Sequence, residues 1–303
     1  MKEPIDQLSW LEFLKNSKQR KELPKKVDKY NRLIAHSKNF FVISGYGAFT
    51  QGYVLVISKQ FIPSYGLINK NEKDELDFLI HELKKSILSE FDRKSVIFEH
   101  GMCACIGGLD RAHLHIMSIS NKSNNITIKK AIRDTLYSRK AGIKHILFNG
   151  YKLENIHDIN QIYESLGSKN KNKDIKIIGK IYKFNDIKSL DQTNWPLVTL
   201  NHIMKGGHYV FFRSDYEDAS FLTTNNFQTQ FGREVVFNNE LNLDKNFLKK
   251  YKIDNFQKEI WKWQNYMFEE NIIETMKKIK IALKRSKKIK KTEYSKFKIN
   301  ICN

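Results

Sequence analysis

The chain has 303 residues, 41% of them hydrophobic, and its 53 Lys and Arg outnumber 33 Asp and Glu to give a formal net charge of +20. Four prolines, fourteen glycines and an ordinary apolar fraction exclude a disordered or collagen-like polymer, and the length allows one large domain or two ordinary ones. Lys and Asn are used heavily throughout, which explains much of the charge. A basic surface still concentrates phosphate-bearing ligands, whether nucleotides or nucleic acid.

No run approaches the roughly 18 apolar residues of a membrane helix, so we expect no membrane partner. The first residues include acidic side chains where a secretory signal needs a basic start and an apolar core, which predicts a cytoplasmic protein. The chain has three cysteines, and Cys103 and Cys105 are only one residue apart. This pattern predicts no disulfide framework.

Hydrophobic periodicity predicts an α+β unit at residues 35–138, preceded by an amphipathic helical lead-in at 1–34. A glycine-containing turn separates two β-rich runs, as in a hairpin, and an amphipathic helix follows them. Two further strands flank a glycine- and cysteine-containing stretch at residues 100–110. The predicted elements are strands at 40–45 and 53–57, a helix at 71–91, strands at 95–99 and 112–119, and a helix at about 127–139.

Residues 139–303 are predicted to form a C-terminal α/β extension that ends in a long helix. Its expected elements are strands at 175–184 and 208–212, a helix at 227–237 and a terminal helix from about residue 257. The terminal helix has an apolar stripe for packing, in which Trp261 and Trp263 are expected to be core anchors. Its basic region, Lys277 to Lys291, is expected to be solvated; the alternative is that it follows a nucleic-acid backbone.

The most informative segment reads Gly107-Gly-Leu-Asp-Arg-Ala-His-Leu-His-Ile-Met-Ser-Ile. On a strand, the period of two places Arg111, His113 and His115 on one face and the intervening apolar residues on the buried face. Three long, potentially cationic side chains in a row can bind an anionic ligand such as phosphate. A neutral imidazole among them can be a nucleophile.

This segment resembles the histidine triad motif, His-φ-His-φ-His-φ-φ with φ apolar, whose middle histidine attacks the α-phosphate of a nucleotide. The strands around Asn39 and Gly52, and Phe98-Glu-His-Gly, are similar to a bacterial subgroup of histidine triad-like proteins, so the resemblance covers about residues 30–125. Segments after residue 208 resemble, weakly, the C-terminal extension of longer members. The implied fold is a histidine triad-like antiparallel sheet with packed helices.

The resemblance implies that His113 is the nucleophile and that His115 is a phosphate ligand and orienting group. The leaving group must be protonated, and His115 is the better candidate because Arg111 cannot do this. The family's first histidine is Arg111 here, which cannot relay protons but can clamp a phosphate. The expected substrate-binding residues are Asn39, His100, Gly107, Gly108, Ser118, Arg213 and Arg233.

Some of these residues have a second interpretation. Arg213 and Arg233 either reach the substrate phosphates or form surface salt bridges. His100 either lines the pocket or caps its loop, and Glu99 could hold it. His100, Cys103 and Cys105 are residue types that bind zinc, but their spacing is poor for a tetrahedral site. The scheme requires no metal or other cofactor.

These observations predict a nucleotide phosphohydrolase or nucleotidyltransferase that forms a nucleotidyl-histidine on His113. The alternative is a nucleotide or RNA-end binding protein that kept the pocket and lost turnover, which Arg111 favours. A third hypothesis, a zinc-stabilised nucleic-acid protein, predicts stoichiometric metal. The expected partner is a nucleotide or nucleotidylated small molecule, or a nucleic-acid end, and the protein is expected to be a monomer or a homodimer.

Overall fold

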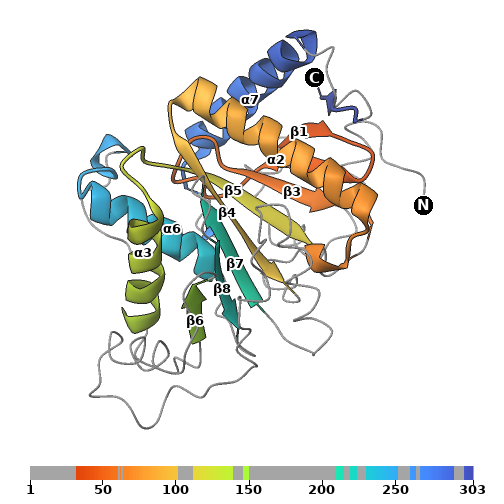
Figure 1. Cartoon of the computed structure of the whole chain (residues 1–303). Coiled ribbons are helices and arrows are strands. Elements are labelled where there is room, and N and C mark those ends of the chain that lie inside the picture. The colour runs from red at the N-terminus through yellow and green to blue at the C-terminus, as the bar shows by residue number, and fades with distance from the viewer. Residues whose placement is uncertain are drawn as a thin grey trace, which may run out of the picture.

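A computed structural model gives the fold of the chain (Figure 1). The structure describes residues 32–60, 62, 64–101, 112–138, 146–149, 209–214, 219–223, 230–251, 260–263, 267–289 and 297–302. Within these residues, helices pack on both faces of one sheet, so the α+β class is confirmed.

All strands of the described residues belong to a single antiparallel sheet in the order β6-β8-β7-β4-β5-β3-β2-β1-β9. The strands are β1 (Leu33–His36), β2 (Phe40–Ser44), β3 (Val54–Ser58), β4 (Lys94–Gly101), β5 (His113–Ile119), β6 (Ile146–Asn149), β7 (Tyr209–Ser214), β8 (Ala219–Thr223) and β9 (Asn300–Ile301). The strand that carries the histidines, β5, lies near the middle of this order, between β3 and β4.

The predicted hairpin is confirmed as β2 and β3, which pair antiparallel from Phe40 opposite Ser58 to Ser44 opposite Val54. Gly47 and Gly52 in its turn have φ of 56° and 84°, a region that favours glycine. The predicted lead-in helix is wrong at its end, because Leu33 begins β1, where pairing with β2 buries it fully. Residues 1–31 lie outside the described residues.

Helix α2 (Lys70–Phe91) confirms the predicted amphipathic helix. A capping box starts it: the Asn69 side chain accepts from the Glu72 backbone N–H, and the Glu72 carboxylate accepts from the Asn69 N–H. Its apolar side chains, with Leu76 and Leu83 among them, pack on the sheet face formed by alternate residues of β3, β4 and β5. A short 3₁₀ turn, η2 (Tyr65–Leu67), precedes the helix.

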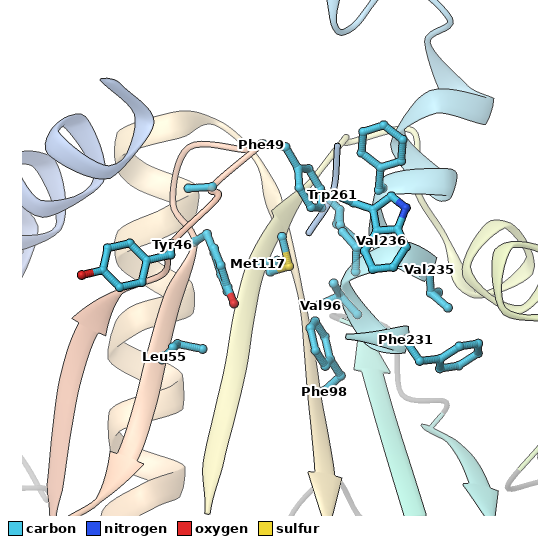
Figure 2. Close-up of a cluster of buried hydrophobic side chains, with 14 of the residues drawn as sticks. Tyr46, Phe49, Leu55, Val96, Phe98, Met117, Phe231, Val235, Val236 and Trp261 are labelled. Atoms are coloured by element: carbon cyan, nitrogen blue, oxygen red, sulfur yellow. The ribbon is translucent and has the colours of Figure 1, made fainter. Parts of the chain in front are cut away.

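The other face of the sheet is covered by α6 (Phe231–Leu243). Figure 2 shows Val96, Phe98 and Met117 of the sheet facing this helix and Trp261. Helix α3 (Asn125–Ser138) lies beside α6 (Figure 1). The 3₁₀ turn η5 (Lys249–Tyr251) follows α6 in the chain. Both sheet faces are therefore core faces.

The last helix, α7 (Glu269–Ile289), packs against α2 (Figure 1). It starts later than predicted, because Trp261 and Trp263 lie in a turn before it. The prediction that Trp261 is a core anchor is confirmed, since it is buried among the residues under α6. The predicted strand at 175–184 falls outside the described residues.

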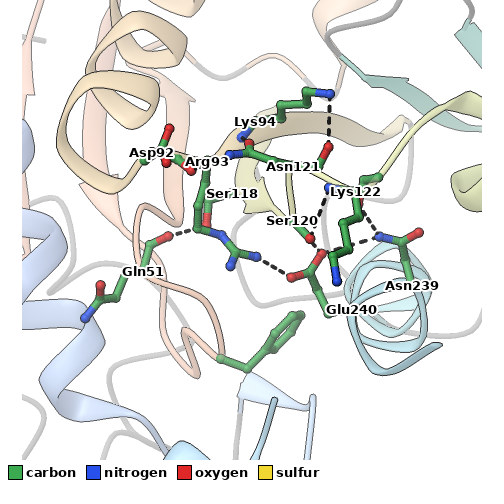
Figure 3. Close-up of polar contacts among 12 residues, drawn as sticks. Gln51, Asp92, Arg93, Lys94, Ser118, Ser120, Asn121, Lys122, Asn239 and Glu240 are labelled. Carbon is green, nitrogen blue, oxygen red and sulfur yellow. Dashed lines mark hydrogen bonds and ion pairs between the residues drawn. The ribbon is translucent and has the colours of Figure 1, made fainter. Parts of the chain in front are cut away.

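Polar contacts connect α6 to the ends of β4 and β5 (Figure 3). The buried carboxylate of Glu240 pairs with Arg93 and accepts from the backbone N–H of Ser120 at 2.8 Å. The Asn239 amide donates to Ser123 Oγ at 2.8 Å. These contacts fix α6 over the sheet.

The sheet continues across the boundary predicted near Ser138. Strand β7, from the later half of the chain, pairs with β4 from Val96 opposite Ser214 to Gly101 opposite Tyr209. Among the helices of the described residues, none has the length and apolar character needed to cross a membrane.

Candidate functional site

The two motif histidines lie on one face of β5, as the period of two predicts. Leu114 and Ile116 point to the opposite face and pack with α2. The histidine face is also packed, however, because Met117 continues it into the fully buried core under α6. The expectation of one chemical face and one core face is therefore wrong: His113 is half-buried and His115 is only 9% exposed.

His115 is held between two aromatic side chains. The ring of Phe98 stacks on it with centroids 4.3 Å apart and planes 11° apart. The Tyr53 ring is nearly parallel to it, and the phenol oxygen lies 2.7 Å from Nδ1 of His115. Burial, together with the charges of His113, His100 and Arg233, holds the pKa of His115 well below its ordinary value. This imidazole is neutral at neutral pH.

His100, at the end of β4, joins the same cluster. Its ring centroid is 6.5 Å from that of His115, and the centroids of His115 and His113 are 5.0 Å apart. The backbone N–H of Gly232, in the first turn of α6, donates to Nε2 of His100 at 3.2 Å. Burial and the charge of His113 lower the pKa of His100 to about 3. Two neutral imidazoles thus flank the more exposed His113.

The N-terminus of α6 faces this cluster. Amides of a first helical turn lack partners within the helix, and His100 accepts from one of them. Gly232 also allows a close approach to the sheet, because a Cβ at this position would lie 2.3 Å from the Phe98 ring. The three imidazoles therefore meet where β4 ends, β5 begins and α6 begins.

Glu99 does not hold His100. Side chains alternate along β4, and the Glu99 carboxylate lies on the α2 face, where it accepts from the Tyr65 backbone N–H at 2.8 Å and the Tyr209 hydroxyl at 2.7 Å. It is fully buried. Burial raises its pKa to about 7, although these hydrogen bonds act in the opposite direction.

The two candidate arginines have different positions, and Arg233 acts on His115 through its charge alone. Arg233 is 1% exposed and donates to the backbone carbonyls of Tyr46, Gly47 and Trp261. Its guanidinium is committed to the protein, so it is neither a phosphate ligand nor a surface salt bridge. Half-buried Arg213 shares its sheet face with Tyr209 and Phe211, which pack with α2, and its charge acts on Asp77 of that helix.

Two other predicted substrate ligands are tied to protein groups. The backbone N–H and side-chain amide of Asn39 donate to the Glu75 carboxylate at 2.9 and 2.6 Å. The Ser118 hydroxyl donates to the Gln51 carbonyl (Figure 3). Ser118 shares the strand face of Leu114 and Ile116, opposite to the histidines. The structure thus brings together His100, His113 and His115, and leaves these two residues apart from them.

Several predicted residues lie outside the described residues: Cys103, Cys105, Gly107, Gly108 and Arg111. Within the described part of the chain, no group of three or more His, Cys, Asp or Glu side chains could hold a metal ion.

Sequence reasoning missed Tyr53, Phe98 and Gly232 as neighbours of the histidines. Tyr53 and Phe98 belong to segments that carry the resemblance but were not predicted as site residues. Their proximity to His115 depends on the β3–β5 and β4–β5 registers. Gly232 comes from a helix more than a hundred residues later. No local signal marks any of the three.

Comparison with known proteins finds no family model and no curated protein that matches this chain.

Proposed function

We propose that the chain is a histidine triad-like protein that acts at the α-phosphate of a nucleotide derivative, with His113 as its nucleophile. The observation that carries the proposal is the difference among the clustered imidazoles: His113 is half-buried, whereas His100 and His115 are buried and neutral. One histidine can meet a substrate while its neighbours stay fixed. The resemblance of Arg111-Ala-His-Leu-His to the histidine triad supports the same role.

The reaction consists of two displacements. A nitrogen of His113 attacks the α-phosphorus, the leaving group departs with the electron pair of its bond to phosphorus and takes any proton it needs from water, and a nucleotidyl-histidine forms with inversion. Water or an acceptor hydroxyl then attacks phosphorus and releases His113. An N–H donor such as His115 stabilises the charge that develops on the phosphoryl oxygens, as does the guanidinium of Arg111.

The expected role of His115 as the acid that protonates the leaving group needs revision. A leaving-group acid must carry a transferable proton near neutral pH, and the strongly lowered pKa of His115 disfavours the imidazolium. A neutral imidazole still offers one N–H. We therefore assign His115 to binding and orienting the phosphate, without protonation of the leaving group.

The test is mass spectrometry of the intact protein after a brief reaction with adenylyl and guanylyl compounds and a quench without acid. We expect a nucleotide-sized adduct on the wild type that is absent from His113→Ala. His81→Ala is the matched control, because this histidine is exposed on α2 and should leave the adduct unchanged. Neither adduct nor substrate loss with any compound would contradict the enzyme.

A binding protein is the second candidate, and it is favoured by Arg111 in place of the first histidine of the motif. It would bind nucleotides measurably and leave them intact. Nucleotide affinity by calorimetry, combined with no turnover in the wild type, would favour this candidate over the enzyme.

A further inference from the structure

We propose that Tyr53 is a positioning residue that holds neutral His115 in the tautomer with its proton on Nε2. In this form His115 presents an N–H donor to an anionic group beside His113. The assignment of the tautomer depends on the geometry and charges of the buried cluster. Its role in turnover rests on the proposed function.

One hydrogen bond joins the Tyr53 phenol and the His115 imidazole. The phenol oxygen of Tyr53 and Nδ1 of His115 are 2.7 Å apart, so one of them donates to the other. Either the phenol donates to a bare Nδ1, which leaves the imidazole proton on Nε2, or a protonated Nδ1 donates to the phenol oxygen. Tyr53 is 2% exposed, so its hydroxyl is shielded from water.

Arg233 selects between these two arrangements. Its buried guanidinium lies with Cζ 5.1 Å from the Tyr53 ring centroid, and its charge acts on the phenol. A cation repels the positive end of the phenol O–H dipole, so the hydroxyl proton turns away from Arg233. The phenol proton then points to His115. Burial raises the pKa of Tyr53 above its ordinary value despite this cation, so that proton is retained at neutral pH.

The surrounding groups fix the positions of Arg233, Tyr53 and His115. Three carbonyls hold Arg233, at 2.9 Å from Tyr46 to Nη1, 2.5 Å from Gly47 to Nη2 and 2.9 Å from Trp261 to Nε. The Tyr53 ring lies against Gly45, where a Cβ would approach a ring carbon to 2.0 Å. On the far side, Phe98 stacks on the His115 imidazole. Neither the phenol nor the imidazole can turn away without displacing these groups.

As a consequence, His115 can donate a hydrogen bond to a phosphate group while its imidazole stays neutral. The charges of Arg233 and His113 both oppose protonation of His115, so an anion would be bound here by a neutral N–H. Within the described part of the cluster, His100 cannot replace this donor through Nε2, which accepts from the Gly232 amide.

The first experiment measures the tautomer directly, by ¹⁵N NMR of the full chain labelled at histidine nitrogens. His115→Gln identifies the His115 signals by their loss. In the wild type we expect a protonated Nε2 and an unprotonated Nδ1. In Tyr53→Phe, which keeps the ring and removes the donor, we expect both His115 signals to move toward a mixture of tautomers. A protonated Nδ1 in the wild type, or unchanged signals in Tyr53→Phe, would overturn the proposal.

Tyr65→Phe is the matched control. Its phenol is also buried and donates to the Val56 carbonyl at 2.7 Å, but it packs on the α2 face. It should cost comparable stability and leave the His115 signals in place. A shift of the same size in both variants would assign the effect to general loosening of the core and would contradict a positioning role.

The second experiment measures turnover with a substrate identified by adduct formation. Complete loss of one preorganised donor costs about 10²–10³-fold in kcat. Because Tyr53→Phe retains part of the correct tautomer, we expect kcat to fall on the order of tenfold and KM to change less. Normal kcat with a shifted tautomer would exclude a role in the reaction. Wild type without turnover would contradict the proposed function, while the NMR result would still decide the tautomer.

Discussion

The least ordinary residue outside the histidine cluster is Glu99. Its fully buried carboxyl accepts from the Tyr65 amide and the Tyr209 hydroxyl, and burial raises its pKa to about 7. In the unfolded chain a glutamate titrates near its ordinary value of about 4.3. Between these two values the folded protein holds a proton that the unfolded chain has released. Glu99 therefore stabilises the fold fully at acidic pH, and this contribution is lost as the pH rises to about 7.

Glu99→Gln should remove this pH dependence. A shift of this size corresponds to about 3–4 kcal/mol in the free energy of unfolding. Relative to wild type, the variant should gain stability progressively from pH 4.5 to 7 and then keep a constant difference. The measurement is urea unfolding of both proteins at matched pH values. The comparison cancels the opposite effect of His100 and His115, which destabilise the fold as acid protonates them. Parallel curves for the two proteins would contradict the prediction.

The positions and partners of the two arginines could not be predicted from the residues around them in the sequence. Arg213 follows an apolar run, Arg233 follows a largely polar one, and both carry a charge that is usually found at a surface. Only the turn around Gly47 and the Trp261 segment, distant in sequence, supply the carbonyls that satisfy buried Arg233. A local pattern predicts that a residue is cationic, but it does not predict its hydrogen-bond partners.

At the scale of single elements, periodicity predicted the structure well where one face is buried. Helix α2 repeats its apolar residues every three or four positions, and β2 and β3 flank a turn with glycines at positive φ. Periodicity failed at Leu33 and at Trp261, where apolar residues at helical spacing belong to a strand and to a turn. In both places contacts with the sheet core outweigh local preference.

The approach of α6 to β4 depends on Gly232. In an ordinary helical position, Gly→Ala stabilises by up to about 1 kcal/mol. Here the added Cβ would lie 2.3 Å from the Phe98 ring, which stacks on His115. We expect Gly232→Ala to lower the free energy of unfolding by about 1–3 kcal/mol, as overpacking of a core does. Urea unfolding of the variant and the wild type measures whether the free energy of unfolding falls or rises.

Phe98→Leu in the same background provides the control for Gly232→Ala. A smaller, flexible side chain relieves the clash, so the second change should cost less in the Gly232→Ala protein than in the wild type. Equal costs in the two backgrounds, or a stabilising Gly232→Ala, would show that α6 does not contact β4 as closely as the structure indicates.

For the whole molecule, the candidate site needs both halves of the chain. His113 and His115 lie before the boundary predicted near Ser138, whereas Gly232 and Arg233, which support the cluster, lie after it. The strand order explains this dependence, since β7 pairs with β4 over the whole length from Val96 to Gly101. Sequence alone separated the chain into a domain and an extension because the composition turns irregular after about residue 139 and the resemblance covers only about residues 30–125. The pairing that joins them is non-local.

A protein that ends at residue 138 should therefore not fold on its own. It would lose the partner strand of β4 and expose Val96 and Phe98, which α6 now buries, while the α2 face would lose its packing with α7. An unpaired strand edge beside an exposed apolar face favours aggregation. We expect no cooperative urea transition for 1–138 by near-ultraviolet circular dichroism, and recovery of one when 139–303 is co-expressed. A cooperative transition of 1–138 alone, at a midpoint near that of the full chain, would instead make the first half an autonomous domain.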